Sequence, residues 1–241
     1  MGQVTLLLVA VQALTRVPVS VPFEAGALGR SVRFFPLVGL GVGGVAAGVF
    51  ALSALGLPTF VAACLSLGAT LLLTGALHED GLADCCDALG GRTAADRLRI
   101  MRDSRIGAFG TLGLLVVTGA KLGCVAALPD AAWALVAAHG VSRAWIVGVS
   151  AALPYARTEG MAAAVAAPAW TDVALAAVFG MGAVLLLGPR ATAALGASGL
   201  VAMGVALYAR RRVGGYTGDV LGGVQQLTEL AVLLAALWRA A

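Results

Sequence analysis

Charged residues are scarce in this sequence. Asp, Glu, Lys and Arg make up 12% of its 241 residues, about half their share in soluble domains, which excludes an ordinary soluble globule. Cysteine and histidine are also scarce, with four and two residues. No two cysteines have CxxC spacing, which argues against a disulfide framework or a zinc site. No basic segment precedes the first apolar stretch, so no removable signal peptide is expected.

Apolar residues fill most of the chain. Hydrophobic residues make up 60% of it and the mean hydropathy is +0.96. Because a helix needs about 20 mostly apolar residues to cross a bilayer, residues 1–241 are predicted to form one all-α, polytopic membrane domain. The seven expected spans are 36–56, 59–77, 107–128, 131–152, 173–188, 191–209 and 219–238. The shorter apolar stretch 4–14 is predicted to be interfacial or re-entrant.

The basic residues predict the orientation of these spans. With seven spans, the longer polar segments all fall on one side, and they are 15–35, 78–106, 153–172 and 210–218. These segments hold 12 of the 16 basic residues, namely Arg16, Arg30, Arg33, Arg92, Arg97, Arg99, Arg102, Arg105, Arg157, Arg210, Arg211 and Arg212. The other side has Arg190 and Arg239. The positive-inside rule therefore predicts a multi-pass protein of the cell (inner) membrane with a cytoplasmic active site. Orientation explains the net charge of +4, and no nucleic-acid partner is expected.

The acidic segment 78–87, HEDGLADCCD, carries the clearest chemical signal. Asp80, Asp84 and Asp87 have i, i+4, i+7 spacing, which places them within about 60° of one another on a helix. Like charges at this spacing repel, and a divalent cation would remove the conflict. An oxygen-only ligand set suits Mg²⁺, with Mn²⁺ as the alternative, so these aspartates are the predicted metal ligands. A solvated acidic helix end is the other interpretation. His78 is assigned to substrate binding, the alternative being a backbone hydrogen bond.

A basic segment follows the acidic one. Thr93 and Asp96 have the spacing of a capping box, which predicts that a short helix begins there. Arginines opposite a metal and carboxylate cluster suit a diphosphate ester, because guanidinium pairs with phosphate oxygens. For Arg97 and Arg99, a position at the lipid headgroups is the favoured interpretation.

The residues at the end of this basic segment are predicted to take part in catalysis. Asp103 and Arg105 stand together where the next span begins, and both are predicted catalytic residues. Arg105 would steady phosphoryl oxygens, and either Asp103 or Glu79 would accept a proton. Arg102 and Ser104 are assigned to substrate binding.

A glycine-rich segment, GGYTGD at 214–219, precedes the last span. Its glycines let backbone N–H groups approach a phosphate, and the following helix N-terminus favours an anion. Gly215, Thr217, Gly218 and Asp219 are therefore assigned to substrate binding. Asp219 could instead be a metal ligand or the N-cap of that helix.

Two cations lie within predicted spans, where charge is costly and usually functional. Lys121 and Arg143 are assigned to substrate binding on that ground. For Lys121 a structural ion pair with Glu229 is the alternative. A GxGxxG match at 39–44 lies inside an apolar span, so it is interpreted as helix packing through Gly39/Gly43 and Gly44/Gly48.

Several motifs, in order, resemble those of the cobalamin synthase family, the adenosylcobinamide-GDP ribazoletransferases. They are TRVP at 15–18, FFPLVG at 34–39, HEDGLAD at 78–84 followed by Asp87, DSRIGAFG at 103–110 and GYTGDVLG at 215–222. The likeness runs from about residue 14 to about residue 233. Adjacent cysteines at 85–86 and a glycine displaced to position 90 depart from the pattern at non-ligand positions.

The resemblance implies a late step of vitamin B12 assembly, dependent on magnesium. α-Ribazole, or its 5′-phosphate, joins adenosylcobinamide-GDP, GMP leaves, and cobalamin or its 5′-phosphate forms. The implied partners are these substrates and the lipid bilayer. A homo-oligomer, or a complex with other cobalamin-assembly enzymes, stays open.

Two other functions compete with this one. CDP-alcohol phosphotransferases have a similar acidic motif, but Asp84 stands where that motif has arginine. An ion-coupled transporter would keep its charged sites near the midplane between repeats, whereas here the carboxylates crowd one edge and no internal repeat is found.

Overall fold

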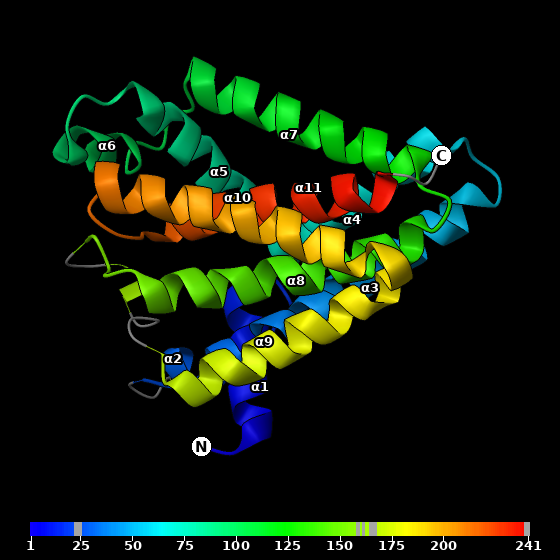
Figure 1. Cartoon of the computed structure of the whole chain (residues 1–241), viewed down its shortest axis with the longest axis horizontal. Helices are drawn as coiled ribbons and strands as arrows, with labels where there is room; N and C mark the ends of the chain where they lie inside the picture. The colour runs from blue at the N-terminus through cyan, green and yellow to red at the C-terminus, as the bar shows by residue number, and fades with distance from the viewer. Residues whose placement is uncertain (22–25, 158–159, 161, 164–167, 239–241) are drawn as a thin grey trace.

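The computed structural model describes residues 1–21, 26–157, 160, 162–163 and 168–238, and these form a helix bundle (Figure 1). Its α-helices are α1 (Gln3–Leu14), α2 (Ala27–Ser31), α3 (Phe35–Ala54), α4 (Thr59–Thr74), α5 (Leu77–Asp87), α6 (Ala94–Ile100), α7 (Ala108–Ala127), α8 (Ala131–Ala152), α9 (Trp170–Val184), α10 (Ala191–Arg212) and α11 (Gly218–Leu237). Short 3₁₀ turns are η1 (Val32–Phe34), η2 (Ala88–Gly90) and η4 (Leu185–Arg190). The all-α prediction is confirmed over the described residues. The predicted capping box is present as well, with Thr93 accepting from the Asp96 N–H at the start of α6.

The apolar helices match the predicted spans, with shifted ends. Five helical segments are long and apolar enough to cross a membrane, or six if the bent pair α4–α5 counts as one span. This count is below seven because α4 has only 16 residues and because 170–212 counts as one segment. Gly188, with φ 54°, interrupts that segment, and Figure 1 shows α10 running back along the bundle. The predicted span 173–188 starts after the true beginning of α9, which is at Trp170.

Two helices form the centre of the bundle. α8 packs against α3, α9 and α11, and α11 also packs against α5 and α10. Gly39 and Gly43 allow the contact between α3 and α8, because a Cβ at Gly43 would lie 2.7 Å from the Val136 Cα, and one at Gly39 would collide with the His139 carbonyl. Helix packing through this pair is confirmed. Gly44 and Gly48 have nothing within 4 Å, so that part of the prediction is wrong within this chain.

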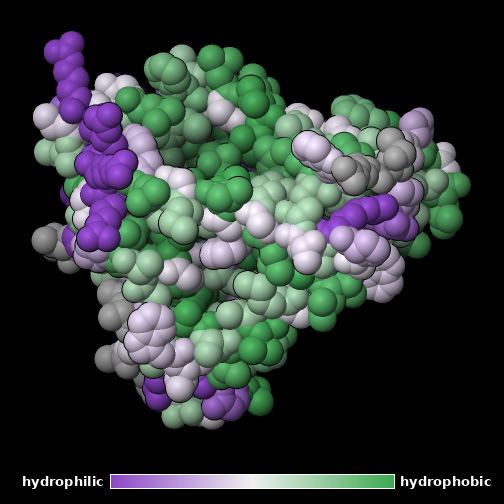
Figure 2. All heavy atoms as spheres, in the orientation of Figure 1, coloured by the Kyte–Doolittle hydropathy of each residue, from purple (hydrophilic) through white to green (hydrophobic). Residues whose placement is uncertain are grey.

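The polar segments lie at one end of the bundle. Figure 1 shows α2, α6, the start of α9 and the α10–α11 connection on the left, and the α3–α4, α7–α8 and α9–α10 connections on the right. Figure 2 shows an apolar middle and a hydrophilic left edge. The predicted clustering of the longer polar segments is therefore confirmed. Arg239, expected on the opposite side, lies outside the described residues. α1 crosses the other helices at a steep angle (Figure 1) and has 12 residues.

A sharp bend separates α4 from α5. The two helices meet at 92°, where Gly75 (φ 67°) and Ala76 (φ 55°) are both left-handed. The Arg16 side chain packs on Gly75, leaving no room for a Cβ there, and the Arg16 N–H donates to the Leu73 carbonyl at 2.7 Å. The predicted span 59–77 therefore runs past its true end at Thr74, and α5 turns away to pack against α11 and α7.

Candidate active site

The candidate site forms where α5 packs against the start of α11. A Cβ on Gly81 would lie 2.9 Å from the Asp219 carbonyl oxygen and 3.1 Å from the Gly222 Cα. Since no side chain fits between them, the two backbones touch at this point. The contact places Asp80 and Asp84 of α5 near Asp219 of α11.

Negative charge is concentrated at this contact. Burial, then Asp219 and Asp80, raise the pKa of the Asp84 carboxyl to about 7. Arg157 opposes them, and its Nη2 donates to Asp219 Oδ2 at 2.7 Å. Among the described residues, the charge of Arg157 thus opposes those of the neighbouring carboxylates Asp80, Asp84 and Asp219. Such a surplus attracts a cation.

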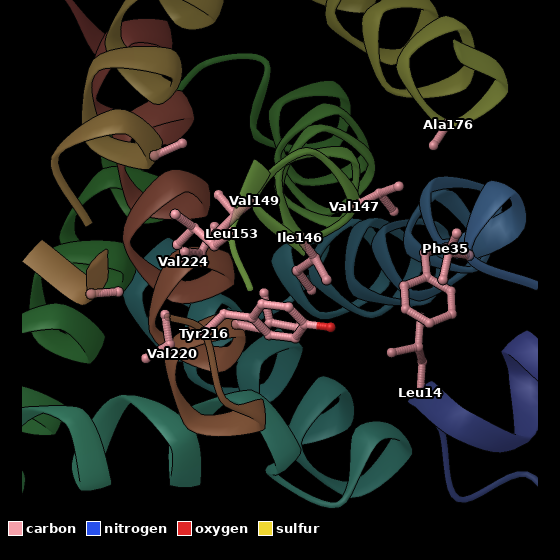
Figure 3. Packing of buried hydrophobic residues seen from close by; sticks show 14 of the residues in the cluster. Leu14, Phe35, Ile146, Val147, Val149, Leu153, Ala176, Tyr216, Val220 and Val224 are labelled. Carbon is pink, nitrogen blue, oxygen red and sulfur yellow. The ribbon is translucent and has the colours of Figure 1, made fainter. Parts of the chain in front are cut away.

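A cavity of about 270 Å³ lies beside these carboxylates. Its polar lining residues are His78, Asp80, Arg157 and Asp219, and its larger apolar lining residues are Leu14, Leu28, Phe35, Leu77, Ile146, Tyr155 and Leu221. Figure 3 shows Leu14 and Phe35 on one side and Ile146 on the other. His78 lines the cavity although most of its side chain is buried. This position is compatible with substrate binding, which stays a prediction.

The glycine-rich segment packs against the end of α8. The Tyr216 N–H donates to the Pro154 carbonyl and the Tyr216 carbonyl accepts from the Ala156 N–H, both at 2.9 Å. A Cβ on Gly215 would collide with the Pro154 carbonyl. Chain packing therefore explains why Gly215 is glycine, without reference to a phosphate. The two hydrogen bonds of Tyr216 also hold the segment that ends at Arg157, which lines the cavity.

The first turn of α11 settles one open assignment. Thr217 is the N-cap, because its hydroxyl accepts from the Val220 N–H at 3.2 Å. The N-cap alternative for Asp219 is therefore wrong. Asp219 is in the first turn of α11 and lines the cavity together with Gly218, where a role toward a ligand stays a prediction.

Asp87 is held by the start of α7. Its Oδ2 accepts from the Gly107 N–H at 2.7 Å and its Oδ1 from the Gly110 N–H at 2.8 Å. Asp87 thus joins the end of α5 to α7, and its predicted metal role is untested by this geometry. Among the described residues, no three His, Cys, Asp or Glu side chains are grouped closely enough to hold a metal ion.

Asp103 and Arg105 pair with each other at the surface. Arg105 Nε donates to Asp103 Oδ1 at 2.9 Å and Nη2 to Oδ2 at 2.6 Å. These bonds lower the pKa of the Asp103 carboxyl to about 2, which makes it a weak base at neutral pH. Neither residue lines the 270 Å³ cavity, and the same holds for Arg102 and Ser104. Their catalytic and binding roles stay predictions.

A buried ion network lies deeper in the bundle, around Glu229. Lys121 Nζ donates to Glu229 Oε1 at 2.7 Å and to Gln226 Oε1 at 2.6 Å. His139 Nδ1 lies 3.0 Å and Arg143 Nη1 lies 3.7 Å from Glu229 Oε2. The structural ion pair between Lys121 and Glu229 is confirmed. Neither Lys121 nor Arg143 lines the 270 Å³ cavity, so their assignment to substrate binding stays a prediction.

Glu79 connects this network to the acidic helix. Gln226 Nε2 donates to Glu79 Oε1 at 2.7 Å, while Glu79 Oε2 is buried with no hydrogen-bond partner among the described residues. The network thus reaches α5 at the residue before Asp80.

Arg157 is the functional candidate that the sequence analysis missed. It lines the cavity, bonds Asp219, and keeps a buried Nε without a partner in the described part of the chain. The sequence analysis used it only for orientation. Its position soon after a span, in a short segment with no other arginine, was the available signal.

Comparisons with known proteins agree with the motif resemblance. The model of the CobS family, described as cobalamin-5-phosphate synthase, matches residues 6–237. One relative is an adenosylcobinamide-GDP ribazoletransferase of Leptothrix cholodnii, 46% identical over 97% of this chain and 96% of the relative. Proteins of the same name from Ralstonia pickettii (46% identical; 93% and 91% covered) and Ralstonia nicotianae (49%; 93% and 92%) are also similar. No solved structure matches.

Proposed function

Because this chain belongs to the cobalamin-5-phosphate synthase (CobS) family of transferases, we propose that it joins α-ribazole, or its 5′-phosphate, to adenosylcobinamide-GDP with release of GMP. The observation that carries this proposal is the meeting of three separate segments at one cavity. They are the acidic helix α5, the start of α11, and the segment that follows α8. In the reaction, the ribazole 3′-hydroxyl attacks the corrinoid-side phosphorus, and the bond to the GMP oxygen breaks.

We propose that Mg²⁺ binds at Asp80 and Asp84. The surplus of carboxylates around Arg157 supports this, because a divalent ion would relieve their repulsion. Mg²⁺ commonly binds through one or two carboxylates, several waters and substrate phosphate oxygens, so a ligand set that the protein leaves incomplete suits it. When bound, magnesium would neutralise charge on the diphosphate.

The chain's own residues position the reacting groups. Arg157 lines the cavity and is oriented by Asp219, and a guanidinium in that position can donate to a phosphoryl oxygen. Of the two predicted proton acceptors, Asp103 is bound to Arg105, whereas Glu79 keeps one unpartnered oxygen. Neither residue lines the cavity, so both stay predicted proton acceptors, and the free oxygen of Glu79 is the reason to test Glu79 first.

The enzyme is proposed to lie in the cell inner membrane with this site facing the cytoplasm. The support is the gathering of arginine-rich segments at the end of the bundle that carries the cavity, which the positive-inside rule assigns to the cytoplasm.

The decisive experiment measures GMP release by the detergent-purified full-length chain. With adenosylcobinamide-GDP and α-ribazole, we expect equimolar GMP and cobalamin in the presence of Mg²⁺ and none after chelation. Absence of GMP at saturating Mg²⁺ would contradict the proposal. Substrate flux in liposomes without bond cleavage would favour a transporter instead.

A further inference from the structure

The 270 Å³ cavity is small for the substrates of the proposed reaction. Its volume is near the lower end of ligand pockets, about 300–1,000 Å³. A corrinoid macrocycle with its side chains exceeds that space. Only a group of nucleoside size fits, which leaves ribazole or the guanosine of GDP as the occupant.

The walls of the cavity are of two kinds. Leu14, Leu28, Phe35, Ile146 and Leu221 line it, and all five belong to one hydrophobic core cluster. They come from α1, α2 and α3 near the start of the chain and from α8 and α11 much later in it.

The polar side chains of the cavity are close to one another. Arg157 forms an ion pair with Asp219 at 2.7 Å, and Asp80 is near enough to Asp219 for the two negative charges to repel each other. The cavity therefore suits a molecule with one apolar part and one polar part.

The two candidate occupants differ in where they are polar. Guanine has hydrogen-bond donors and acceptors around its ring edge, and burying them against Leu and Phe side chains without partners is unfavourable. The base of ribazole is a dimethylated benzimidazole, which has no N–H donor once it is joined to ribose. Apart from one ring nitrogen, which can accept a hydrogen bond, its polar groups are on the ribose.

We infer that this cavity is the acceptor site, and that it binds the benzimidazole of ribazole among the apolar side chains with the ribose toward Asp80, Arg157 and Asp219. The guanosine of the corrinoid substrate then lies outside the cavity. This inference rests on the proposed function and adds which substrate each part of the site receives.

The test measures binding of α-ribazole alone to the detergent-purified full-length chain by equilibrium dialysis, with no turnover required. Leu221→Ala shortens the apolar wall from α11. Leu234→Ala is the matched control, because Leu234 is on the same helix but 49% exposed. We expect Kd for α-ribazole to rise at least about tenfold for Leu221→Ala, since the loss of even one methylene from an apolar pocket is worth about tenfold or more, and to be unchanged for Leu234→Ala. KM for ribazole should rise equally, while KM for adenosylcobinamide-GDP stays the same.

A second measurement uses the unaltered protein, so that it does not depend on the variant folding. We expect α-ribazole to bind more tightly than the riboside of unmethylated benzimidazole, and guanosine not to displace it. Displacement of α-ribazole by guanosine or GMP would overturn the inference. Weaker binding of GMP to Leu221→Ala, with unchanged binding of α-ribazole, would overturn it as well. Mg²⁺-dependent GMP release without any ribazole binding would also overturn it, yet leave the proposed function standing. Binding that depends on Leu221 without GMP release would support the acceptor site and contradict the function.

Discussion

Two polar regions of the molecule use carboxylates in opposite ways. Inside the bundle, Glu229 is surrounded by Lys121, His139, Arg143 and the Gln225 amide. At the polar end, among the described residues, Asp80, Asp84 and Asp219 lie near one another, and Arg157 is the cation that opposes them and pairs with Asp219. An unpaired charge away from water is strongly unfavourable, and the inner region is balanced, because the cations Lys121 and Arg143 are matched by Glu229 and, through Gln226, by Glu79. A surplus of negative charge is less unfavourable in the outer region, because water is near. Unbalanced charge therefore separates the candidate site from a network whose evident role is structural.

Removing one charge from the outer region should give the largest effect. In Asp84→Asn, we expect kcat/KM for GMP release to fall about a thousandfold, because a lost metal ligand removes several kcal/mol of charge stabilisation. Thermal stability should hold or rise, since Asp80 and Asp219 lose a like charge. Normal turnover at saturating Mg²⁺ would contradict the metal role.

Removing one charge from the inner region should affect folding instead. Lys121→Met leaves Glu229 without its closest cation, which costs roughly 3–5 kcal/mol for a buried pair. The thermal midpoint in detergent should drop, and the double variant Lys121→Met/Glu229→Gln should recover part of it. The control is Arg190→Met, whose partner Asp130 is 3.9 Å away and largely exposed, so a change within about 1 kcal/mol is expected. An equal drop in thermal midpoint for Lys121→Met and Arg190→Met would show that the buried network stabilises the fold no more than an exposed ion pair does.

Pushing α5 away from α11 should weaken the site while leaving every charge in place. Gly81→Ala puts a Cβ 2.9 Å from the Asp219 carbonyl, a close contact that costs about 1–3 kcal/mol. We expect GMP release to slow about tenfold to a hundredfold, since misplacement by about 1 Å has this effect. Gly90→Ala is the control because nothing lies within 4 Å of that position. Unchanged activity in Gly81→Ala would show that the glycine contact does not set the site.

The smallest effect is expected at Asp103. Arg105 holds the pKa of Asp103 at about 2, so this carboxylate stays ionised across pH 5–9. Any stability from this lowered pKa is present above the ordinary value of about 3.9 and is lost only as the pH falls toward 2. Asp103→Asn should therefore leave the pH profile of GMP release unchanged and alter kcat/KM only about twofold, as for most surface substitutions. Loss of the acidic limb of that profile would restore Asp103 as the base.

Local sequence patterns predicted what depends on neighbours along the chain. Apolar runs located the helices, and the i, i+4 spacing of Asp80 and Asp84 placed both at the site, because a helix converts that spacing into one face. The bend at Ala76 was not predictable in this way, since alanine ordinarily favours a continuing helix. The predicted span 59–77 accordingly ran through it.

Contacts between distant segments were out of reach of such patterns. Asp87 shares the face of the other aspartates, but its partners Gly107 and Gly110 are 20 and 23 residues away. Arg157 meets Asp219 across 62 residues. Only the folded chain brings these partners together.

The right angle between α4 and α5 has a consequence for how the substrates arrive. A straight continuation of α4 would have raised the acidic residues one above another along a single axis. Because α5 instead lies against α11 and α7, Asp80 and Asp84 are held on packed helices beside the start of α11. For the proposed substrate, we expect the bulky, water-soluble macrocycle to remain in the aqueous phase, so that only its short phosphate tether has to reach these carboxylates.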